Sequence, residues 1–266
     1  IHNNGELGTF ADDVEAISGG ANIVSGTSPS AYCDYGSPDL MGLDLMMTFR
    51  SYEECDKMNE SDLFKELAAP LESASNIKAL AMNWGNMPRC VLANKPISSV
   101  ADLKGLIIRV PLAAYVSFFT RLGCTTQSMS LADTYTALSQ GTIDACEFGY
   151  DTLFNNSMYE VATNCFVSEH TYAPSMWCMN TDLFYGLSAD DQKAVLDAFY
   201  HGGQSYEKMN EDNQGDYRSK MEEKGVTFVE PSDADKTTMQ QAAADSASDF
   251  DLSDGLMDKI AAVLGR

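Results

Sequence analysis

The amino-acid sequence predicts an α/β protein in which strands and helices alternate along the chain. Within residues 101–148, short apolar runs alternate with segments of helical spacing, which implies parallel strands joined by right-handed crossovers. The pattern of helix end, glycine stop and strand at residues 137–145 is echoed at residues 16–24. The echo indicates either two α/β domains built alike or a chance agreement at glycine-stopped helices. No low-complexity linker separates the two halves, and domains joined by several crossing strands would fit that absence.

Helix starts and glycine stops place the elements of the first third of the chain. A helix is expected to end at Gly19 and a strand to follow as far as Val24. After an apolar segment at residues 43–49, Ser51 begins a helix with capping-box character. A further helix is expected near residues 62–71, and a strand at residues 77–82.

The central segment has the clearest local signals. Leu106–Val110 is an apolar run closed by Pro111, as expected of a buried parallel strand. Apolar residues from Tyr115 to Leu122 recur at helical spacing, and Gly123 ends that helix. A strand at residues 125–129, a helix capped by Ser130 and a strand at residues 142–148 complete the segment.

Residues 187–225 have a helical pattern of unusual length, which predicts one long helix bridging two domains. Gly202 and Gly203 together cost on the order of 2 kcal/mol of helix propensity relative to two alanines, so a kink or break there is the alternative. A strand at residues 226–229 and helices near residues 232–246 and 254–264 are expected to follow.

The charge of the chain excludes two classes of partner. With 17 Lys and Arg residues against 39 Asp and Glu residues, the formal net charge is -22. Nucleic acid and anionic membranes are bound largely by positive charge, so neither is expected as a partner. No run reaches the roughly 18 apolar residues needed to span a membrane, and Ile1 opens the chain without a signal-peptide pattern, which is compatible with a processed or truncated chain.

The seven cysteines are scattered, without a C-x-x-C pair or a Cys/His cluster at zinc spacing. We interpret most of them as small buried apolar residues, and we predict no metal and no cofactor. An odd count leaves at least one thiol free in a monomer, and spacing leaves any disulfide pairing open.

One arginine stands at a position where open α/β sheets bind ligands. Ligands of such sheets lie beyond the carboxyl ends of the parallel strands, where helix N-termini also point their N–H groups. Arg109 and Glu147 both fall at such strand ends. A structural ion pair with one of the many acidic residues is the alternative interpretation of Arg109.

Four blocks of sequence, in order, resemble a known family. They are RCVLANKPI at residues 89–97, DLKGLIIRVP at residues 102–111, YTALSQGTID at residues 135–144 and LSADDQ at residues 187–192. Their order and spacing resemble the substrate-binding proteins of tripartite ATP-independent periplasmic (TRAP) transporters, of the DctP type. Segments at residues 6–8 and 44–49 resemble earlier parts of the family, so the resemblance covers essentially the whole chain.

The resemblance implies a two-lobed clamp of the periplasmic-binding-protein kind, with crossing strands and a long interdomain helix. Residues 1–87 and 174–213 would form the first lobe, and residues 88–173 and 214–266 the second. Such a protein is not an enzyme: it would capture a small organic acid in the bacterial periplasm and deliver it to TRAP transporter membrane subunits, without inserting into the membrane. Family members usually begin with a strand and a helix that precede the segment matching Ile1–Gly8, so the first lobe is expected to lack them.

The resemblance also implies a set of ligand-binding residues. Arg109 matches the arginine that pairs with the substrate carboxylate, and Arg89 matches a second arginine that some members use. A guanidinium offers two parallel N–H donors to a carboxylate, which lysine cannot reproduce. Glu147 and Phe148 follow at an acidic and a ligand-facing position, and Phe148 replaces the asparagine of sialic-acid-binding members, which disfavours a heavily hydroxylated sugar acid. Further candidates at the cleft edge are Leu131, Trp84 and Trp177. The alternative interpretation is packing in the core, which is equally favoured for Phe148 and somewhat favoured for both tryptophans.

Two other functions remain open from the sequence. The same clamp could serve as the extracytoplasmic sensing module of a signalling protein. A cysteine hydrolase would use Cys146 as nucleophile, with His170 or His201 as base, whereas the ordinary interpretation is a buried thiol and surface histidines.

Overall fold

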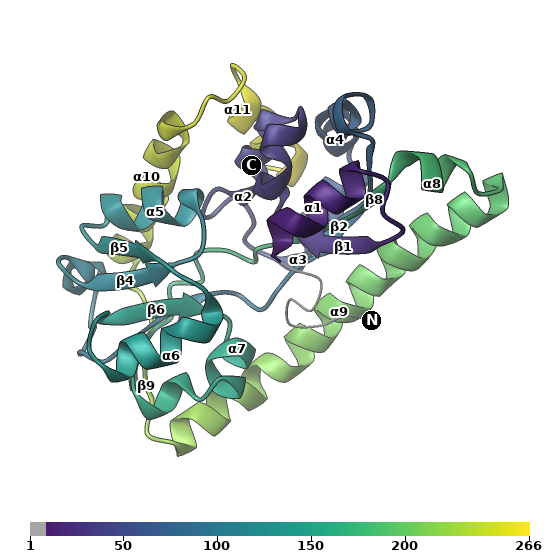
Figure 1. The fold of residues 1–266 in the computed structure, drawn as a ribbon. Helices are drawn as coiled ribbons and strands as arrows, with labels where there is room; N and C mark the ends of the chain where they lie inside the picture. Colours follow the sequence, from purple (N-terminus) through teal and green to yellow (C-terminus); the bar gives the residue numbers. More distant parts are fainter. Residues whose placement is uncertain (1–8) are drawn as a thin grey trace.

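The computed structural model describes residues 9–266, which form two α/β lobes (Figure 1). The first lobe contains a three-stranded sheet in the order β1 (Val24–Thr27), β8 (Ser175–Asn180), β2 (Ile77–Trp84). The second contains a six-stranded sheet in the order β5 (Thr125–Ser128), β4 (Ile107–Val110), β6 (Ala145–Phe148), β3 (Cys90–Ala93), β7 (Asn164–Phe166), β9 (Thr227–Val229). The predicted two-lobed α/β architecture is confirmed.

The two sheets differ in strand direction. In the second lobe, β4 pairs in parallel with β5 and β6, as the alternating pattern predicts. Strand β3, however, enters antiparallel between β6 and β7. In the first lobe, β8 pairs antiparallel with both β1 and β2. The helix–glycine–strand echo therefore reproduces a local unit, α1–β1 and α6–β6, but not the same sheet around it.

Helices cover both sheets. The first lobe carries α1 (Phe10–Ser18), α2 (Met41–Asp44), α3 (Tyr52–Glu60), α4 (Asp62–Ser75) and α8 (Thr181–Tyr185), and the second carries α5 (Ala113–Arg121), α6 (Leu131–Ser139), α7 (Tyr150–Asn155) and α10 (Asp233–Ser246). The last helix, α11 (Leu256–Leu264), packs against α2, α3 and α4, on the first-lobe side. The residue boundaries of the lobes otherwise stay a prediction, and the resemblance noted at residues 6–8 lies outside the described residues.

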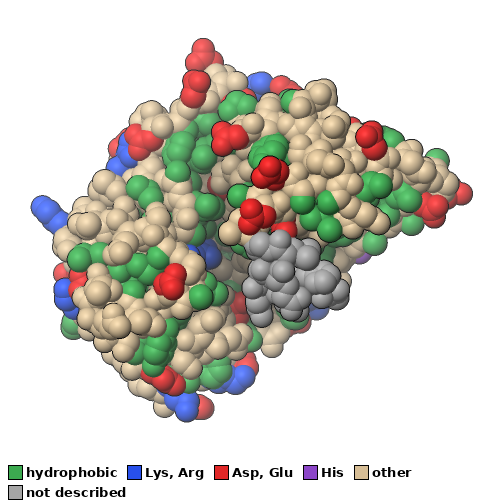
Figure 2. All heavy atoms as spheres, viewed as in Figure 1, with side chains coloured by type: hydrophobic (Ala, Val, Ile, Leu, Met, Phe, Trp, Pro, Cys, Tyr) green, Lys and Arg blue, Asp and Glu red, His purple; other side chains and the backbone are tan. Residues whose placement is uncertain are grey.

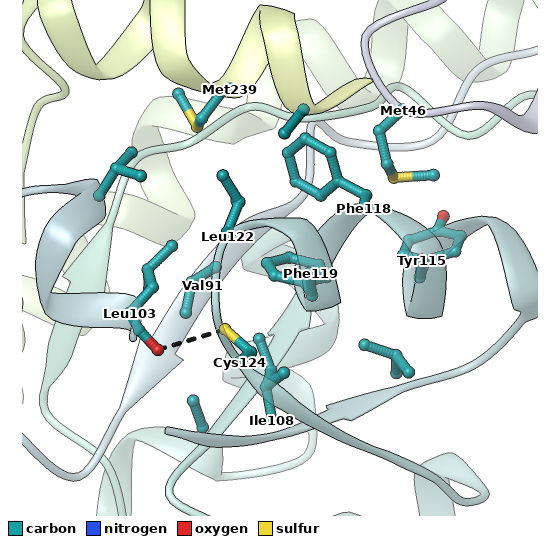
Figure 3. Close-up of a cluster of buried hydrophobic side chains, with 14 of the residues drawn as sticks. Met46, Val91, Leu103, Ile108, Tyr115, Phe118, Phe119, Leu122, Cys124 and Met239 are labelled. Atoms are coloured by element: carbon teal, nitrogen blue, oxygen red, sulfur yellow. Dashed lines mark hydrogen bonds between the residues drawn. The ribbon is translucent and has the colours of Figure 1, made fainter. Parts of the chain in front are cut away.

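Helix α5 anchors the core of the second lobe (Figure 3). Phe118, Phe119 and Leu122 are buried in one cluster with Val91 and Ile108 of the sheet. Met239 of α10 closes this cluster from outside, and the Cys124 thiol donates to the Leu103 carbonyl at 3.3 Å. Six of the seven cysteines are buried, as predicted for most of them, and all seven are unpaired, a point that the spacing left open.

The chain crosses between the lobes through segments that bond to one another. Residues 85–89 join β2 to β3, and residues 167–174 join β7 to β8. The N–H groups of Asn86 and Arg89 donate to the carbonyls of Tyr172 and Thr171, at 2.7 and 3.0 Å. The segment between α2 and α3 also reaches this junction, where the Met47 N–H donates to the His170 carbonyl at 2.7 Å. The crossings are therefore tied together by backbone hydrogen bonds.

Helix α9 (Ala189–Glu223) is one continuous helix of 35 residues that contacts β2 of the first lobe and α7 of the second (Figure 1). The predicted alternative of a break at the glycine pair is wrong, because both glycines face β2. A Cβ added at Gly203 would lie 2.5 Å from the Asn83 carbonyl oxygen, and one at Gly202 would lie 2.8 Å from the Trp84 ring. Close approach of helix and strand, not helix termination, requires glycine here. Although α9 is long, no described helix is apolar enough to cross a membrane.

A buried acid on α9 holds the crossing at Gly85. Glu207 is 3% exposed, and its Oε1 accepts the Gly85 N–H at 3.1 Å. Asn210, one turn further, donates to the Gly85 carbonyl at 3.0 Å. Burial, reinforced by the nearby Asp56 carboxylate and opposed by the Gly85 hydrogen bond, raises the pKa of Glu207 to about 8. At neutral pH the side chain is therefore mostly protonated.

The glycine contacts predict an asymmetric response to alanine. Gly203→Ala forces the added Cβ against backbone and should lower the free energy of unfolding by about 1–3 kcal/mol despite its better helix propensity. Gly215→Ala, at a position on the same helix where nothing lies within 4 Å, should raise it by up to about 1 kcal/mol. Urea unfolding of the two variants measures both, and stabilisation by Gly203→Ala would show that the close packing is absent.

The Glu207 pKa predicts a pH dependence of stability. Because the folded-state pKa is raised above the ordinary value of 4.5, the protonated acid contributes stability in full below about pH 4.5 and loses it as pH rises through about 8. Between about pH 4.5 and about pH 8, the free energy of unfolding of the wild type should fall relative to that of Glu207→Gln. Above about pH 8 the difference between the two proteins should stay constant. Urea unfolding at a series of pH values tests this, and parallel profiles would refute it.

Candidate functional site

Three neighbouring strands bring two arginines and one acid together at one edge of the second-lobe sheet. Arg109 on β4 lies opposite Cys146 on β6, so Glu147 and Phe148 follow beside it. Val91 on β3 lies opposite Glu147, which places Arg89, two residues earlier, at the end of β6. Four predicted site residues, Arg89, Arg109, Glu147 and Phe148, are thus brought together. Figure 2 shows a hollow between the two lobes with basic side-chain atoms lying in it.

Glu147 is the centre of this group. It is fully buried, and its two carboxylate oxygens accept hydrogen bonds from Nε and NH2 of Arg89 at 2.6 and 2.8 Å. These two bonds make a two-point contact. NH2 of Arg89 also donates to the Glu147 backbone carbonyl at 2.8 Å. Burial alone would raise the pKa of Glu147, but Arg89 and the hydrogen bonds from Arg89 and His170 hold it below its usual value. Burial also acts to lower the pKa of Arg89. The charge and the hydrogen bond of Glu147 act in the opposite direction, and the net effect is a raised pKa of Arg89.

His170 completes the contacts of this acid from a crossing segment. Its Nε2 lies 3.2 Å from Glu147 Oε2, and its Nδ1 lies 2.8 Å from the Ser168 hydroxyl. Burial lowers the pKa of His170, against the opposing effect of Glu147, so the ring is neutral at physiological pH. The rings of Tyr115, Phe118 and Phe119 surround it at centroid distances of 5.2–6.2 Å. Glu147 is therefore bonded on both sides, by Arg89 and by His170.

Arg109 is left with donors that Glu147 does not satisfy. Its side chain is buried, and its Nε donates to the Met129 carbonyl at 3.0 Å. Its NH1 lies 3.5 Å from Glu147 Oε1, too far for a good hydrogen bond, and finds no hydrogen-bond partner among the described residues. Burial lowers the pKa of Arg109, and Glu147 opposes that effect. NH1 of Arg109 is therefore a buried donor without a hydrogen-bond partner among the described residues.

Phe148 lies against both cations. Its ring centroid is 4.5 Å from the guanidinium carbon of Arg109 and 5.0 Å from that of Arg89. A cation over an aromatic face is attracted by the ring and loses orientational freedom. Phe148 is buried, so it helps to fix the two guanidinium groups.

The other predicted site residues lie elsewhere. Trp84 and Trp177 pack against each other at a ring-centroid distance of 4.9 Å, with their planes tilted by 52°, and both contact Phe199 of α9. The Trp84 Nε1 donates to the Phe199 carbonyl at 2.9 Å, so this indole serves the packing of α9 on β2. Leu131, the first residue of α6, is 36% exposed and follows the Met129 carbonyl that holds Arg109 by two residues.

Sequence reasoning missed two residues of this region. His170 is considered there only as a hydrolase base, and Tyr115 only as part of an apolar helix face. Tyr115 carries no local signal, because a tyrosine on an apolar helix face is ordinarily core.

The geometry does not support a cysteine nucleophile. Cys146 is fully buried, and burial raises the pKa of its thiol far above the usual value, with Glu147 adding to that effect. His170 is engaged by Glu147 and Ser168, and no described hydrogen bond joins it to Cys146. Within residues 9–266, no group of three or more His, Cys, Asp or Glu side chains is arranged to hold a metal ion.

Comparison with known families decides the class of the protein. Residues 1–251 match the family model described as bacterial extracellular solute-binding protein, family 7. The chain belongs to this family. The resemblance to TRAP substrate-binding proteins is thereby confirmed, and with it a solute-binding function in the periplasm. It is a family of transport proteins and not one of enzymes.

Individual relatives agree with this assignment. A solute-binding protein of Verminephrobacter eiseniae is 26% identical over 93% of this chain and 73% of its own length. The 2,3-diketo-L-gulonate-binding periplasmic protein of Escherichia coli is 29% identical over 82% of this chain and 66% of its own length. A TRAP periplasmic solute-binding protein of Actinobacillus succinogenes, solved with bound L-galactonate, is 27% identical with a TM-score of 0.87, over 98% of this chain and 86% of that one. The chain thus spans about two thirds to three quarters of the two curated relatives.

The buried ion pair predicts a large loss of stability when Glu147 is neutralised. Glu147→Gln leaves the Arg89 guanidinium buried without its counter-charge and should cost about 3–5 kcal/mol of unfolding free energy. Asp197→Asn removes an exposed pair with Lys193 on α9 and should change it by less than about 1 kcal/mol. Chemical unfolding of both variants tests this, and equal effects would mean that Arg89 and Glu147 are solvated.

Proposed function

We propose that this protein captures a small organic acid by pairing its carboxylate with Arg109, closes its two lobes over it, and delivers it to TRAP transporter membrane subunits. The observation that carries the proposal is the state of Arg109. It is a buried arginine whose NH1 has no hydrogen-bond partner among the described residues, and it stands beside an acid that is already bonded to Arg89 and His170. A carboxylate offers both the missing charge and two acceptors in the geometry of a guanidinium fork.

The other predicted residues take supporting roles in this proposal. Arg89 holds Glu147 and adds positive charge to the site, while Phe148 keeps both guanidinium groups in place. Leu131 lies at the rim, and Trp84 and Trp177 set the position of α9. The apolar Phe148 ring favours a small carboxylate with a hydrocarbon or aromatic body over a heavily hydroxylated one. The E. coli and A. succinogenes relatives take 2,3-diketo-L-gulonate and L-galactonate, both of which carry a carboxylate.

The crossing segments supply a route from ligand to lobe closure. His170 contacts Glu147 through its ring, and its carbonyl accepts the Met47 N–H at 2.7 Å. A ligand that contacts both lobes only when they are closed stabilises the closed state by that difference in contacts. Binding at Arg109 therefore acts on the part of the chain where the lobes are joined. The lobe boundaries at residues 87/88, 173/174 and 213/214 are part of this proposal, except that α11 packs with the first lobe.

Variants of Arg109 test the proposal directly. In a thermal-shift screen followed by calorimetry, wild-type protein should bind at least one monocarboxylate, and Arg109→Ala should weaken that binding by about 100-fold, the equivalent of about 3 kcal/mol for a charged two-point contact. Arg109→Lys should lose most of it as well, because an ammonium group cannot make two parallel contacts.

Arg218→Ala provides the matched control, since this arginine pairs with Glu222 and Glu230 at the exposed end of α9. It should leave affinity unchanged. Undiminished binding in Arg109→Ala would show that the carboxylate does not pair with Arg109, and undiminished binding in Arg109→Lys would rule out the two-point contact.

A further inference from the structure

Unfavourable backbone conformations gather where the lobes are joined. Within residues 9–266, five residues other than glycine have a positive φ: Met47, Asn76, Ser157, Glu169 and Ala173. Asn76 ends helix α4, and Ser157 lies in a turn inside the second lobe. The other three, with φ of 60°, 41° and 38°, lie in the segments that meet at the junction of the lobes. A side chain crowds the backbone in this left-handed region, so such conformations persist only where surrounding contacts hold them.

Ala173 has a second reason to avoid this conformation. Pro174 follows it, and the residue before a proline is pushed toward extended backbone, with φ of about −120°. The observed φ of 38° is far from that value. Ala173 lies between the β7–β8 crossing and the first residue of β8, so its φ sets the direction in which the chain enters the first lobe. A change from the observed to the extended conformation would therefore turn one lobe relative to the other.

Hydrogen bonds hold Ala173 in the observed conformation from both sides. Asn86 Nδ2 donates to the Ala173 carbonyl at 2.6 Å, and the Ala173 N–H donates to Thr171 Oγ1 at 2.9 Å. Asn86 is fixed in turn from α9, because its Oδ1 accepts the Tyr206 hydroxyl at 2.9 Å. The line of contacts runs from α9, through the β2–β3 crossing, to the β7–β8 crossing. It therefore links three connections between the lobes at the one residue whose backbone is strained.

We propose that Tyr206, Asn86 and Ala173 form a strained latch that sets the balance between two arrangements of the lobes. The hydrogen bonds hold Ala173 in the left-handed conformation, and breaking them lets Ala173 relax to extended backbone while the lobes move. Strain and hydrogen bonding act against each other, which reduces the free-energy difference between the two arrangements. A ligand can then shift the balance with a modest difference in contacts. The inference rests on the lobe movement in the proposed function and is independent of Arg109.

Hydrogen exchange at the crossings tests the latch without any ligand. The Arg89 N–H bonds across the junction to the Thr171 carbonyl, so its exchange reports how often the crossings separate. Ala173→Gly relieves the strain and should slow this exchange by about fivefold. Tyr206→Phe keeps the ring but removes the hydroxyl, and it should speed the exchange by about fivefold, the equivalent of one hydrogen bond of about 1 kcal/mol.

Matched substitutions separate the latch from general effects on stability. Ser157→Gly relieves a left-handed residue inside the second lobe, and Tyr185→Phe removes an exposed hydroxyl that bonds Glu72 in the first lobe. Both should leave exchange of the Arg89 N–H unchanged. The latch is refuted if Ser157→Gly slows this exchange as much as Ala173→Gly does, or if Tyr206→Phe leaves it unchanged.

Distances between the lobes connect the latch to their movement. Spin labels attached through unnatural amino acids at Lys65 of α4 and Thr136 of α6, both exposed, report the separation of the lobes. Ala173→Gly should raise the ratio of the latched to the relaxed population by about fivefold, and Tyr206→Phe should lower it by as much. If exchange changes but neither variant changes the distances, control of the lobes by the latch is refuted. Carboxylate binding by Arg109→Ala tests the proposed function separately.

Discussion

The buried charge of Glu147 is the constraint on which the site depends. A carboxylate with no exposure is tolerated only because Arg89 contacts both of its oxygens and His170 contacts one of them. This pairing has a consequence for Arg109, since the nearest acid is already satisfied and lies 3.5 Å from its NH1. Arg89 neutralises the acid inside the lobe, and Arg109 is the cation that we propose pairs with the ligand carboxylate.

The same acid connects the site to the architecture. His170 stands in a crossing segment whose backbone bonds to the β2–β3 crossing and to the α2–α3 segment, so the chain around Glu147 is also the chain that joins the lobes. Across the molecule, α9 bridges the lobes and packs closely on β2 through Gly202 and Gly203. Glu207 and Asn210 of that helix hold both backbone groups of Gly85, the residue that starts another crossing. The contacts around Glu147 and the contacts that join the lobes therefore overlap.

Local sequence patterns predicted those elements and site residues whose positions depend only on neighbouring residues in the chain. Arg109 could be placed at a strand end because an apolar run and Pro111 define that strand within a few residues. The Arg89–Glu147 ion pair could not be predicted in this way. It requires β3 to enter antiparallel beside β6, and it joins residues that are 58 positions apart in the chain. Core packing is the favoured interpretation of Trp84 from the sequence, but its partner α9 could not be predicted, because that contact depends on how closely helix and strand approach. The glycines that permit that approach were themselves read as a possible break, since propensity takes no account of packing.

A crystal structure with a bound monocarboxylate tests the central claim most directly. The ligand carboxylate should bond to the terminal nitrogens of Arg109, while Arg89 keeps its two-point contact with Glu147 and His170 stays at the other side of that acid. A ligand carboxylate that displaces Glu147 from Arg89, or that binds without touching Arg109, would contradict it.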